Sequence, residues 1–138
     1  WERNQVDLLL TEGTEFICPW TERRITKRVK YDLDHLLPVS VYPINELWNL
    51  VPSDPYFNSH RKRDRLPNPE RLAKAEPHLM LAYINYEASQ SLSQAIHEDV
   101  GVRFASVQMD STDFPLAVAR VVTSFIDQVA VSRNLARF

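Results

Sequence analysis

Residues 31–67 hold the pattern that most restricts the folds open to this chain. From Tyr31 to Leu37, apolar and polar side chains alternate with the period of a β-strand, and a proline ends the run. A proline-rich loop follows, and Leu47–Val51 predicts a second short strand. Ser53 is suited to cap a helix that extends to about Arg65. The segment therefore predicts a strand–loop–strand–helix unit.

Four polar side chains occupy defined places in this unit. Two end the first strand, one lies in the second strand, and one lies about a turn into the helix: Asp34, His35, Asn49 and Asn58. Histidine titrates closest to neutral pH, so His35 is a candidate general base. The oxygens of Asp34 and Asn58 are hard donors of the kind that Mg²⁺ and Mn²⁺ prefer. Neighbouring strand residues face opposite sides, so Asp34 and His35 share one site only where the strand bends or ends.

Positive charge is concentrated around the same segment. The whole chain has a net charge of −2, whereas residues 20–65 carry nine basic and six acidic side chains. Two groups supply these nine residues: Arg61, Lys62, Arg63 and Arg65 at the end of the predicted helix, with His60 beside them, and Arg23, Arg24, Lys27, Arg28 and Lys30 before the first strand. A local basic surface suits a polyanion held at one face, and a solvated charged surface is the alternative.

At these positions the chain resembles the HNH nucleases, also called the ββα-metal or His-Me finger family. The resemblance covers residues 14–67 and includes the Asp-His-Leu-Leu-Pro sequence at 34–38 and the Ser-Asp pair at 53–54. The spacing is similar to that in the HNH domain of RNA-guided CRISPR nucleases, and residues 16–25 resemble a lead-in common in HNH proteins. The resemblance implies a ββα-metal core and an endonuclease activity that depends on a divalent metal.

The resemblance also implies a role for each of the four polar residues. His35 corresponds to the general base that deprotonates water. Asp34 and Asn58 correspond to the two protein ligands of one metal ion, expected to be Mg²⁺ or Mn²⁺. Asn49 corresponds to the asparagine whose side chain bonds backbone near the base and holds His35 in place.

Two departures from the family pattern refine these expectations. Many members carry a third metal ligand where this chain has Lys62, so we expect two protein ligands and more bound water. Arg61 or Lys62 fits the place of the family's phosphate contact. Many members also bind zinc through cysteine pairs, but Cys18 is alone, so no structural zinc is expected. We expect a small core of large side chains instead: Phe16, Trp20 and Trp48.

The rest of the chain predicts helices. Their expected spans are residues 2–11, 69–75, 77–97 and 113–133, with Gly101 as a stop after the third. We therefore expect an α+β fold in two parts. Residues 1–67 would form the nuclease core with an N-terminal helix, and residues 68–138 would form a helical extension packed on it.

The predicted function is a metal-dependent endonuclease that cuts DNA, expected to be double-stranded, with little sequence specificity of its own. By family habit it would be an effector domain of a larger bacterial defence or restriction protein, partnered by a sensor domain or subunit. The alternatives are a subunit that binds nucleic acid without cutting it, and an RNase of the same fold. The single cysteine fits a reducing, cytoplasmic setting, and no stretch approaches eighteen apolar residues, so no membrane partner is expected.

Overall fold

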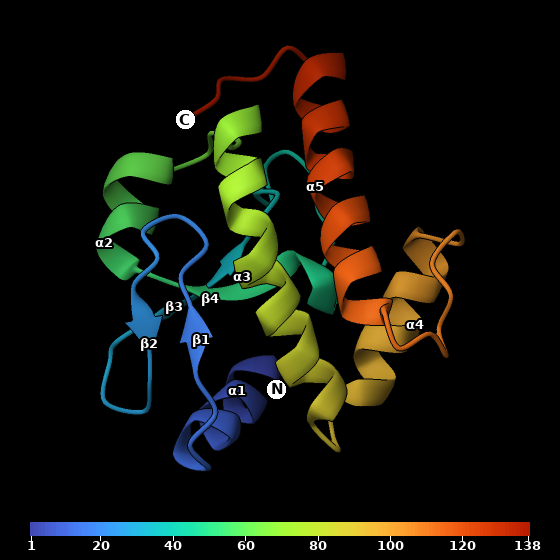
Figure 1. Ribbon diagram of the computed structural model, residues 1–138. Helices are drawn as coiled ribbons and strands as arrows, with labels where there is room; N and C mark the ends of the chain where they lie inside the picture. Colours follow the sequence, from blue (N-terminus) through green and yellow to red (C-terminus); the bar gives the residue numbers. More distant parts are fainter.

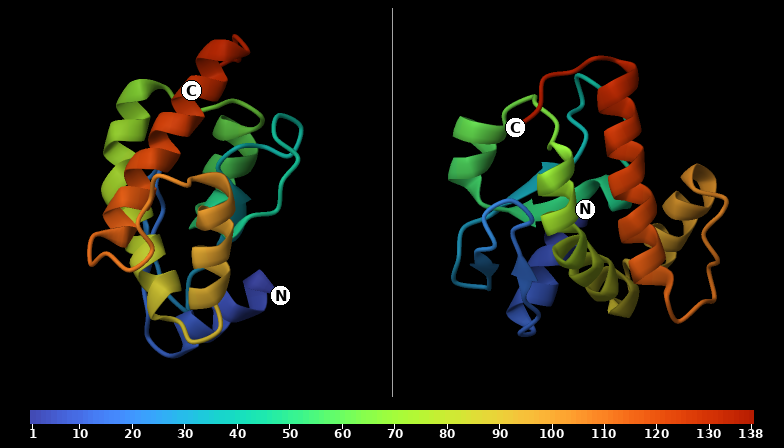
Figure 2. Two further views of the ribbon diagram at one scale, coloured as in Figure 1. Left: turned by 90° about the vertical axis from the view of Figure 1, so that its right-hand side faces the viewer. Right: turned by 45° about the horizontal axis from the view of Figure 1, so that its top comes forward.

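The fold combines two small antiparallel sheets with helices. The computed structural model describes residues 1–138 and confirms the α+β class (Figures 1 and 2). The elements in chain order are α1 (Glu2–Thr11), β1 (Phe16–Ile17), β2 (Arg24–Ile25), β3 (Asp32–His35), η1 (Leu47–Asn49), β4 (Leu50–Ser53), α2 (Pro55–Phe57), η2 (Asn58–Lys62), α3 (Pro69–Ala88), α4 (Ser93–Arg103) and α5 (Phe114–Ser132). One apolar cluster runs through all parts of the chain, and it includes the three large residues expected to form a small core: Phe16, Trp20 and Trp48.

A hairpin of β3 and β4 leads directly into α2 and η2 (Figure 1). The two strands are antiparallel, with Asp34 opposite Val51 and His35 opposite Leu50. η2 is a turn of π-helix, in which the Arg63 N–H donates to the Asn58 carbonyl at 3.0 Å. Single π-turns are rare and often occur at functional sites. The strand–loop–strand–helix order is the one that the sequence predicts.

Two strand boundaries differ from the prediction. β3 ends at His35 rather than at Leu37, because backbone and side-chain oxygens of Asn49 accept the next two N–H groups, at 2.8 Å each. Residues 47–49 form a 3₁₀ turn, and the second strand begins only at Leu50. β3 therefore ends directly after His35, and a site shared by Asp34 and His35 stays a prediction.

The helix boundaries differ as well. Asp54, not Ser53, caps α2, because its Oδ1 accepts a hydrogen bond from the Tyr56 N–H at 2.9 Å. The helical run ends at Lys62 rather than at Arg65, since Arg63 adopts a φ of 50°, which a helix cannot continue.

The C-terminal helices also depart from the predicted spans. The expected break before Pro77 is absent, and α3 continues through it, because α3 keeps one buried face on both sides of the proline. The real break lies at residues 89–92, where the Ser89 hydroxyl accepts the Leu92 N–H at 3.2 Å. Gly101 lies inside α4 rather than after a helix. The last helix begins after Asp113 as predicted, although the Asp113 side chain makes no capping bond.

Helix α3 joins the C-terminal part to the hairpin unit, and it lies between the strands and α5 in Figures 1 and 2. The Tyr83 hydroxyl donates to the Trp48 carbonyl at 2.7 Å, and the Tyr86 hydroxyl donates to the Leu50 carbonyl at 2.6 Å. Both tyrosines are fully buried. The division at residue 67 therefore separates segments of sequence that share one core.

Helix α5 is long and apolar enough to cross a membrane by length and composition alone, although the sequence analysis found no qualifying stretch. Its inward residues Val118, Val122 and Ile126 are fully buried in the apolar cluster. These apolar residues of α5 therefore pack in the core of this fold.

Candidate functional site

Two side chains of β3 face two side chains of η2. Asp32 and Asp34 are two residues apart in a strand and project from the same face. Asn58 and Lys62 are four residues apart in the turn that packs against this face. Nδ2 of Asn58 donates to Oδ2 of Asp32 at 3.1 Å, and Nζ of Lys62 lies 3.3 Å from Oδ2 of Asp34. Two adjacent polar pairs therefore join the hairpin to the helix.

Asp32 is a candidate that the sequence reasoning missed. The sequence pairs Asn58 with Asp34, whereas the structure brings Asn58 to Asp32. Asp32 is partly exposed, so its carboxylate is accessible to a ligand. The signal was present in the alternation of β3, which places Asp32 on the face of Asp34. The assignment of Asp34 and Asn58 as ligands of one metal stays a prediction.

Lys62 is buried in the site rather than presented to solvent. It is 1% exposed, and its ammonium donates to the His35 carbonyl at 2.8 Å as well as pairing with Asp34. Held in this way, the ammonium does not reach the surface of the protein. The expectation that Lys62 contacts a phosphate is therefore wrong for this structure, and Lys62 instead ties η2 to the end of β3.

Asp34 lies in a nearly dry environment. It is 7% exposed, and its Oδ2 has no hydrogen-bond donor in good geometry. Burial raises the pKa of Asp34, while Lys62, the Trp20 indole and the charge of His35 act against that rise. The Trp20 Nε1 is also buried without a partner, so this N–H lies near Asp34 outside hydrogen-bonding geometry. The cation that this structure places beside the oxygen is the Lys62 ammonium, 3.3 Å away.

Asn49 fixes the chain that follows the candidate base. It is fully buried, and its Oδ1 accepts the Leu37 N–H at 2.8 Å while its Nδ2 donates to the Leu37 carbonyl at 3.1 Å. The Asn49 backbone carbonyl accepts the Leu36 N–H at 2.8 Å. These bonds end β3 at His35 and set its backbone. The catalytic relevance of this support stays a prediction.

The basic residues around η2 form an exposed surface. A shallow pocket of about 580 Å³ lies among the side chains of residues 60, 61 and 63–65. On the same surface the rings of Tyr56 and His60 stack with centroids 4.2 Å apart, and Tyr56 is 64% exposed. Arg61 and Arg63 are exposed and make no ion pair. These arginines are free to contact an anionic ligand beside Asn58.

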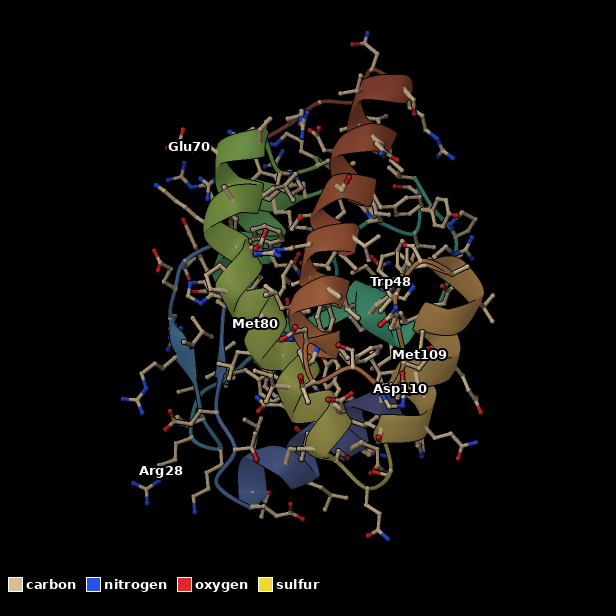
Figure 3. All side chains as sticks on the ribbon, turned by 45° about the vertical axis from the view of Figure 1, so that its right-hand side comes forward. Arg28, Trp48, Glu70, Met80, Met109 and Asp110 are labelled. Carbon is tan, nitrogen blue, oxygen red and sulfur yellow. The ribbon has the colours of Figure 1, made fainter.

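The second basic group lies elsewhere. Arg24 pairs with Glu15 at 2.6 Å on the β1–β2 sheet, so its charge is already balanced. Lys27 and Arg28 border a hollow shared with the end of α1. Figure 3 places Arg28 at the opposite end of the molecule from Glu70, which begins α3 just after η2. The contact of Arg24, Lys27, Arg28 and Lys30 with nucleic acid stays a prediction.

The donor set of the site suits a hard cation. No group of three or more His, Cys, Asp or Glu residues is placed to hold a metal. The carboxylates of Asp34 and Asp32 and the amide oxygen of Asn58 fit Mg²⁺ or Mn²⁺, which accept such oxygens together with water. Cys18 is buried, and its sulfur accepts the Asp54 N–H at the start of α2 at 3.3 Å. Lys62 is the group that competes with a metal for Asp34.

Comparison with known proteins agrees with this geometry. Residues 18–68 match the family model described as HNH endonuclease. No curated protein and no solved structure gives a significant match to the chain. The similarity to RNA-guided nucleases and defence effectors stays a prediction. The matched segment, residues 18–68, holds β3, β4, α2 and η2, and over this segment the chain is similar to HNH endonucleases.

Proposed function

We propose that residues 18–68 hydrolyse phosphodiester bonds of double-stranded DNA with the help of Mg²⁺ or Mn²⁺. The observation that carries this proposal is the packing of η2 against the carboxylate face of β3. It brings Asn58 to Asp32 at 3.1 Å, next to Asp34 and at the strand end formed by His35. Base, oxygen donors and exposed arginines thus belong to one small unit. HNH nucleases generally use a divalent metal, which fits this donor set.

In the proposed mechanism His35 accepts a proton from the attacking water. Asn49 keeps the base in place, because its bonds to Leu37 hold the backbone that follows it. Asp34 and Asn58 would hold the metal, with Asp32 as the nearest further oxygen donor. When bound, such an ion stabilises the charge that develops on the phosphate and on the leaving 3′ oxygen.

The arginines of η2 supply the binding energy that does not depend on sequence. Arg61 and Arg63 are exposed beside Asn58, where their guanidinium groups can pair with backbone phosphates. Phosphate contacts position a nucleic acid but carry no sequence information. We therefore expect affinity that falls steeply with salt and depends little on base sequence.

Plasmid cleavage tests the proposal directly. Supercoiled DNA is incubated with the protein and a series of Mg²⁺ and Mn²⁺ concentrations, beside a single-stranded RNA and an RNA duplex. We expect metal-dependent nicking of DNA that His35→Ala abolishes while DNA binding persists. His78→Ala is the matched control, because His78 lies on α3, pairs with Glu22 and has no role in the proposed site, so this variant should cut normally. Absence of nicking by the wild type under all conditions would reject the enzyme, and preferential cleavage of RNA would identify an RNase.

One observation favours a second candidate, a subunit that binds DNA without cutting it. The ammonium of Lys62 lies beside Asp34, where a family member with a third ligand would hold a metal. If Lys62 keeps this place, a divalent ion meets a positive charge at the site. Titration with Mn²⁺, followed by electron paramagnetic resonance, separates the candidates, since a non-cleaving subunit would bind DNA but no Mn²⁺.

We propose further that this nuclease is the effector of a larger bacterial defence or restriction protein. The resemblance to defence nucleases supports this role. Its test is phage infection of cells that carry the full parent gene or its His35→Ala variant. Equal plaque numbers in the two strains would reject a defence role.

A further inference from the structure

The last residues of the chain pair with the segment that leaves the nuclease helix. The Leu66 N–H donates to the Ala136 carbonyl at 3.0 Å, and the Phe138 N–H donates to the Leu66 carbonyl at 2.9 Å. Arg137 donates to the Pro67 carbonyl at 2.9 Å and pairs with Asp127 of α5 at 2.6 Å. Residues 136–138 therefore form a strap between α5 and the end of the nuclease unit.

The ring of Phe138 contacts two aromatic residues that adjoin the site. It meets Trp20 edge-on with centroids 5.3 Å apart, and it meets Phe57 at 5.7 Å. Phe57 directly precedes Asn58, and the Trp20 indole lies next to Asp34. One side chain outside the matched segment 18–68 thus touches the neighbours of both predicted metal ligands.

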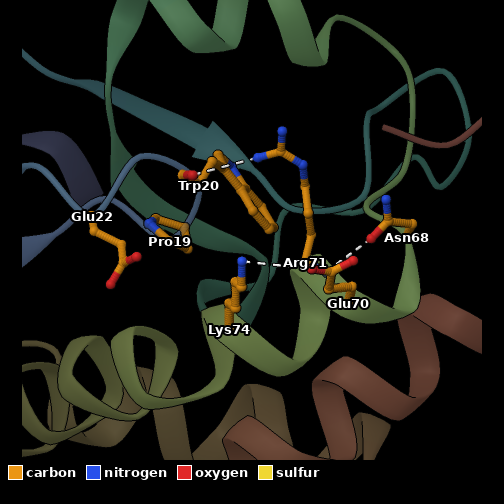
Figure 4. Close-up of a pocket in the computed structure, with 7 residues that line it drawn as sticks. All are labelled: Pro19, Trp20, Glu22, Asn68, Glu70, Arg71 and Lys74. Carbon is orange, nitrogen blue, oxygen red and sulfur yellow. Dashed lines mark hydrogen bonds and ion pairs between the residues drawn. The ribbon is translucent and has the colours of Figure 1, made fainter.

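Arg71 completes this cluster from α3. Its guanidinium lies over the rings of Phe57 and Phe138, 5.0 and 5.1 Å from their centroids. It also donates to the Trp20 carbonyl at 3.5 Å, and Figure 4 shows this bond across the pocket beside α3. The aromatic rings are therefore held from two sides, by the strap and by the first turn of α3.

We propose that Phe138 is a positioning residue of the nuclease site. Its ring packs against Phe57, which precedes Asn58, and against Trp20, which lies next to Asp34. Through these two contacts Phe138 fixes the position of Asn58 relative to Asp34. The proposal rests on the proposed function, because it assigns Asn58 and Asp34 to the site. Groups that orient metal ligands typically change metal affinity or activity about 10- to 100-fold when they are removed.

The test compares Phe138→Ala with Val118→Ala, which truncates a fully buried residue of α5 that takes no part in the aromatic contacts around Phe138. Each variant is measured for urea unfolding, Mn²⁺ affinity, and kcat and KM on plasmid DNA. In Phe138→Ala we expect Mn²⁺ affinity and kcat to fall about tenfold or more with KM little changed. Val118→Ala should lose stability only, and Phe138→Leu, which keeps an apolar side chain, should recover part of the loss.

A readout independent of activity separates the two proposals. The side-chain amide resonances of Asn58 and the indole resonance of Trp20 should shift in Phe138→Ala and not in Val118→Ala. If the wild type neither cuts nor binds Mn²⁺ while these shifts occur, the proposed function fails and the positioning role stands. The positioning role is refuted if the wild type cuts and two further results hold. In both variants, the decreases in kcat and Mn²⁺ affinity and the resonance shifts would then be proportional to the loss of stability.

Discussion

The ammonium of Lys62 lies 3.3 Å from the carboxylate of Asp34, and both side chains are buried. The pair joins η2 to β3, the strand that ends at His35. Removing one partner from a buried pair leaves an uncompensated charge, whereas replacing both by neutral groups is often tolerated. Substitutions of this pair therefore test whether its main role is to stabilise the fold or to leave Asp34 available to a cation.

We predict that Asp34→Asn and Lys62→Met each lower the free energy of unfolding by about 3–5 kcal/mol. The loss arises because Lys62 or Asp34 is left buried without its counter-charge. The double variant should recover much of that loss, and urea denaturation of all four proteins measures the coupling. Lys74→Met is the control, since Lys74 and Glu70 form an exposed pair worth at most about 1 kcal/mol. Additive losses in the double variant would show that the two buried groups are not coupled.

A second prediction concerns Asp32. Asp32→Asn removes the carboxylate nearest to Asn58 but leaves no buried charge unpaired, because Asp32 is partly exposed. We expect Mn²⁺ affinity to fall about tenfold or more while stability changes by less than about 0.5 kcal/mol. Calorimetric titration and urea unfolding measure the two quantities. Asp64→Asn, an exposed acid on the basic surface, should change neither. Unaltered Mn²⁺ binding in Asp32→Asn would remove Asp32 from the site.

Asn49 gives a third prediction. Asn49→Ala deletes two hydrogen bonds to Leu37 in a fully buried place and leaves the backbone N–H and carbonyl of Leu37 unsatisfied. Each unsatisfied group costs about 1–3 kcal/mol, so we expect a clear loss of stability together with a lower kcat. Urea unfolding and plasmid nicking at saturating metal provide the measurements. Asn85→Ala removes an exposed bond to Glu15 and should leave nicking intact. A stable Asn49→Ala that cuts normally would contradict the support of His35 by Asn49.

The order of strand, loop, strand and helix was predictable from local patterns. Alternation in β3 and the prolines between the strands are short-range signals that hold in the structure. The exact strand end was not predictable, because it depends on Asn49 bonding to Leu37 across a loop. The cap moved from Ser53 to Asp54 for a similar reason, since pairing with Asp32 in the hairpin keeps Ser53 extended.

The sequence predicts a set of candidate site residues, but it does not predict their contacts. The spacing identified Asn58, and only the packing of η2 on β3 shows that its neighbour is Asp32. Lys62 reads as a surface residue within a basic run, yet the turn of π-helix directs it to Asp34. The contribution of Phe138 was beyond sequence reasoning, because 80 residues separate it from Asn58 and no local pattern links the two.

The buried tyrosines lead to a prediction about alkaline pH. Tyr31, Tyr83 and Tyr86 are buried, and burial raises the pKa of each hydroxyl above its ordinary value near 10. In the unfolded chain these hydroxyls ionise near pH 10, whereas in the folded protein they stay protonated. Unfolding therefore releases protons above pH 10, and the stability that is present below this pH is lost as pH rises.

We expect the free energy of unfolding to fall by about 1.4 kcal/mol per pH unit for each of these tyrosines once pH exceeds about 10. Tyr86→Phe should reduce that slope by one such increment, and at pH 8 it should cost about 1 kcal/mol for the lost bond to the Leu50 carbonyl. Tyr56→Phe should leave the slope unchanged, because the Tyr56 side chain is 64% exposed rather than buried. Urea unfolding at pH 8, 10 and 11 gives the slopes. Equal slopes for wild type and Tyr86→Phe would show that Tyr86 ionises within the folded protein. The buried hydrogen bond from Tyr86 of α3 to Leu50 of β4 would then not persist at high pH.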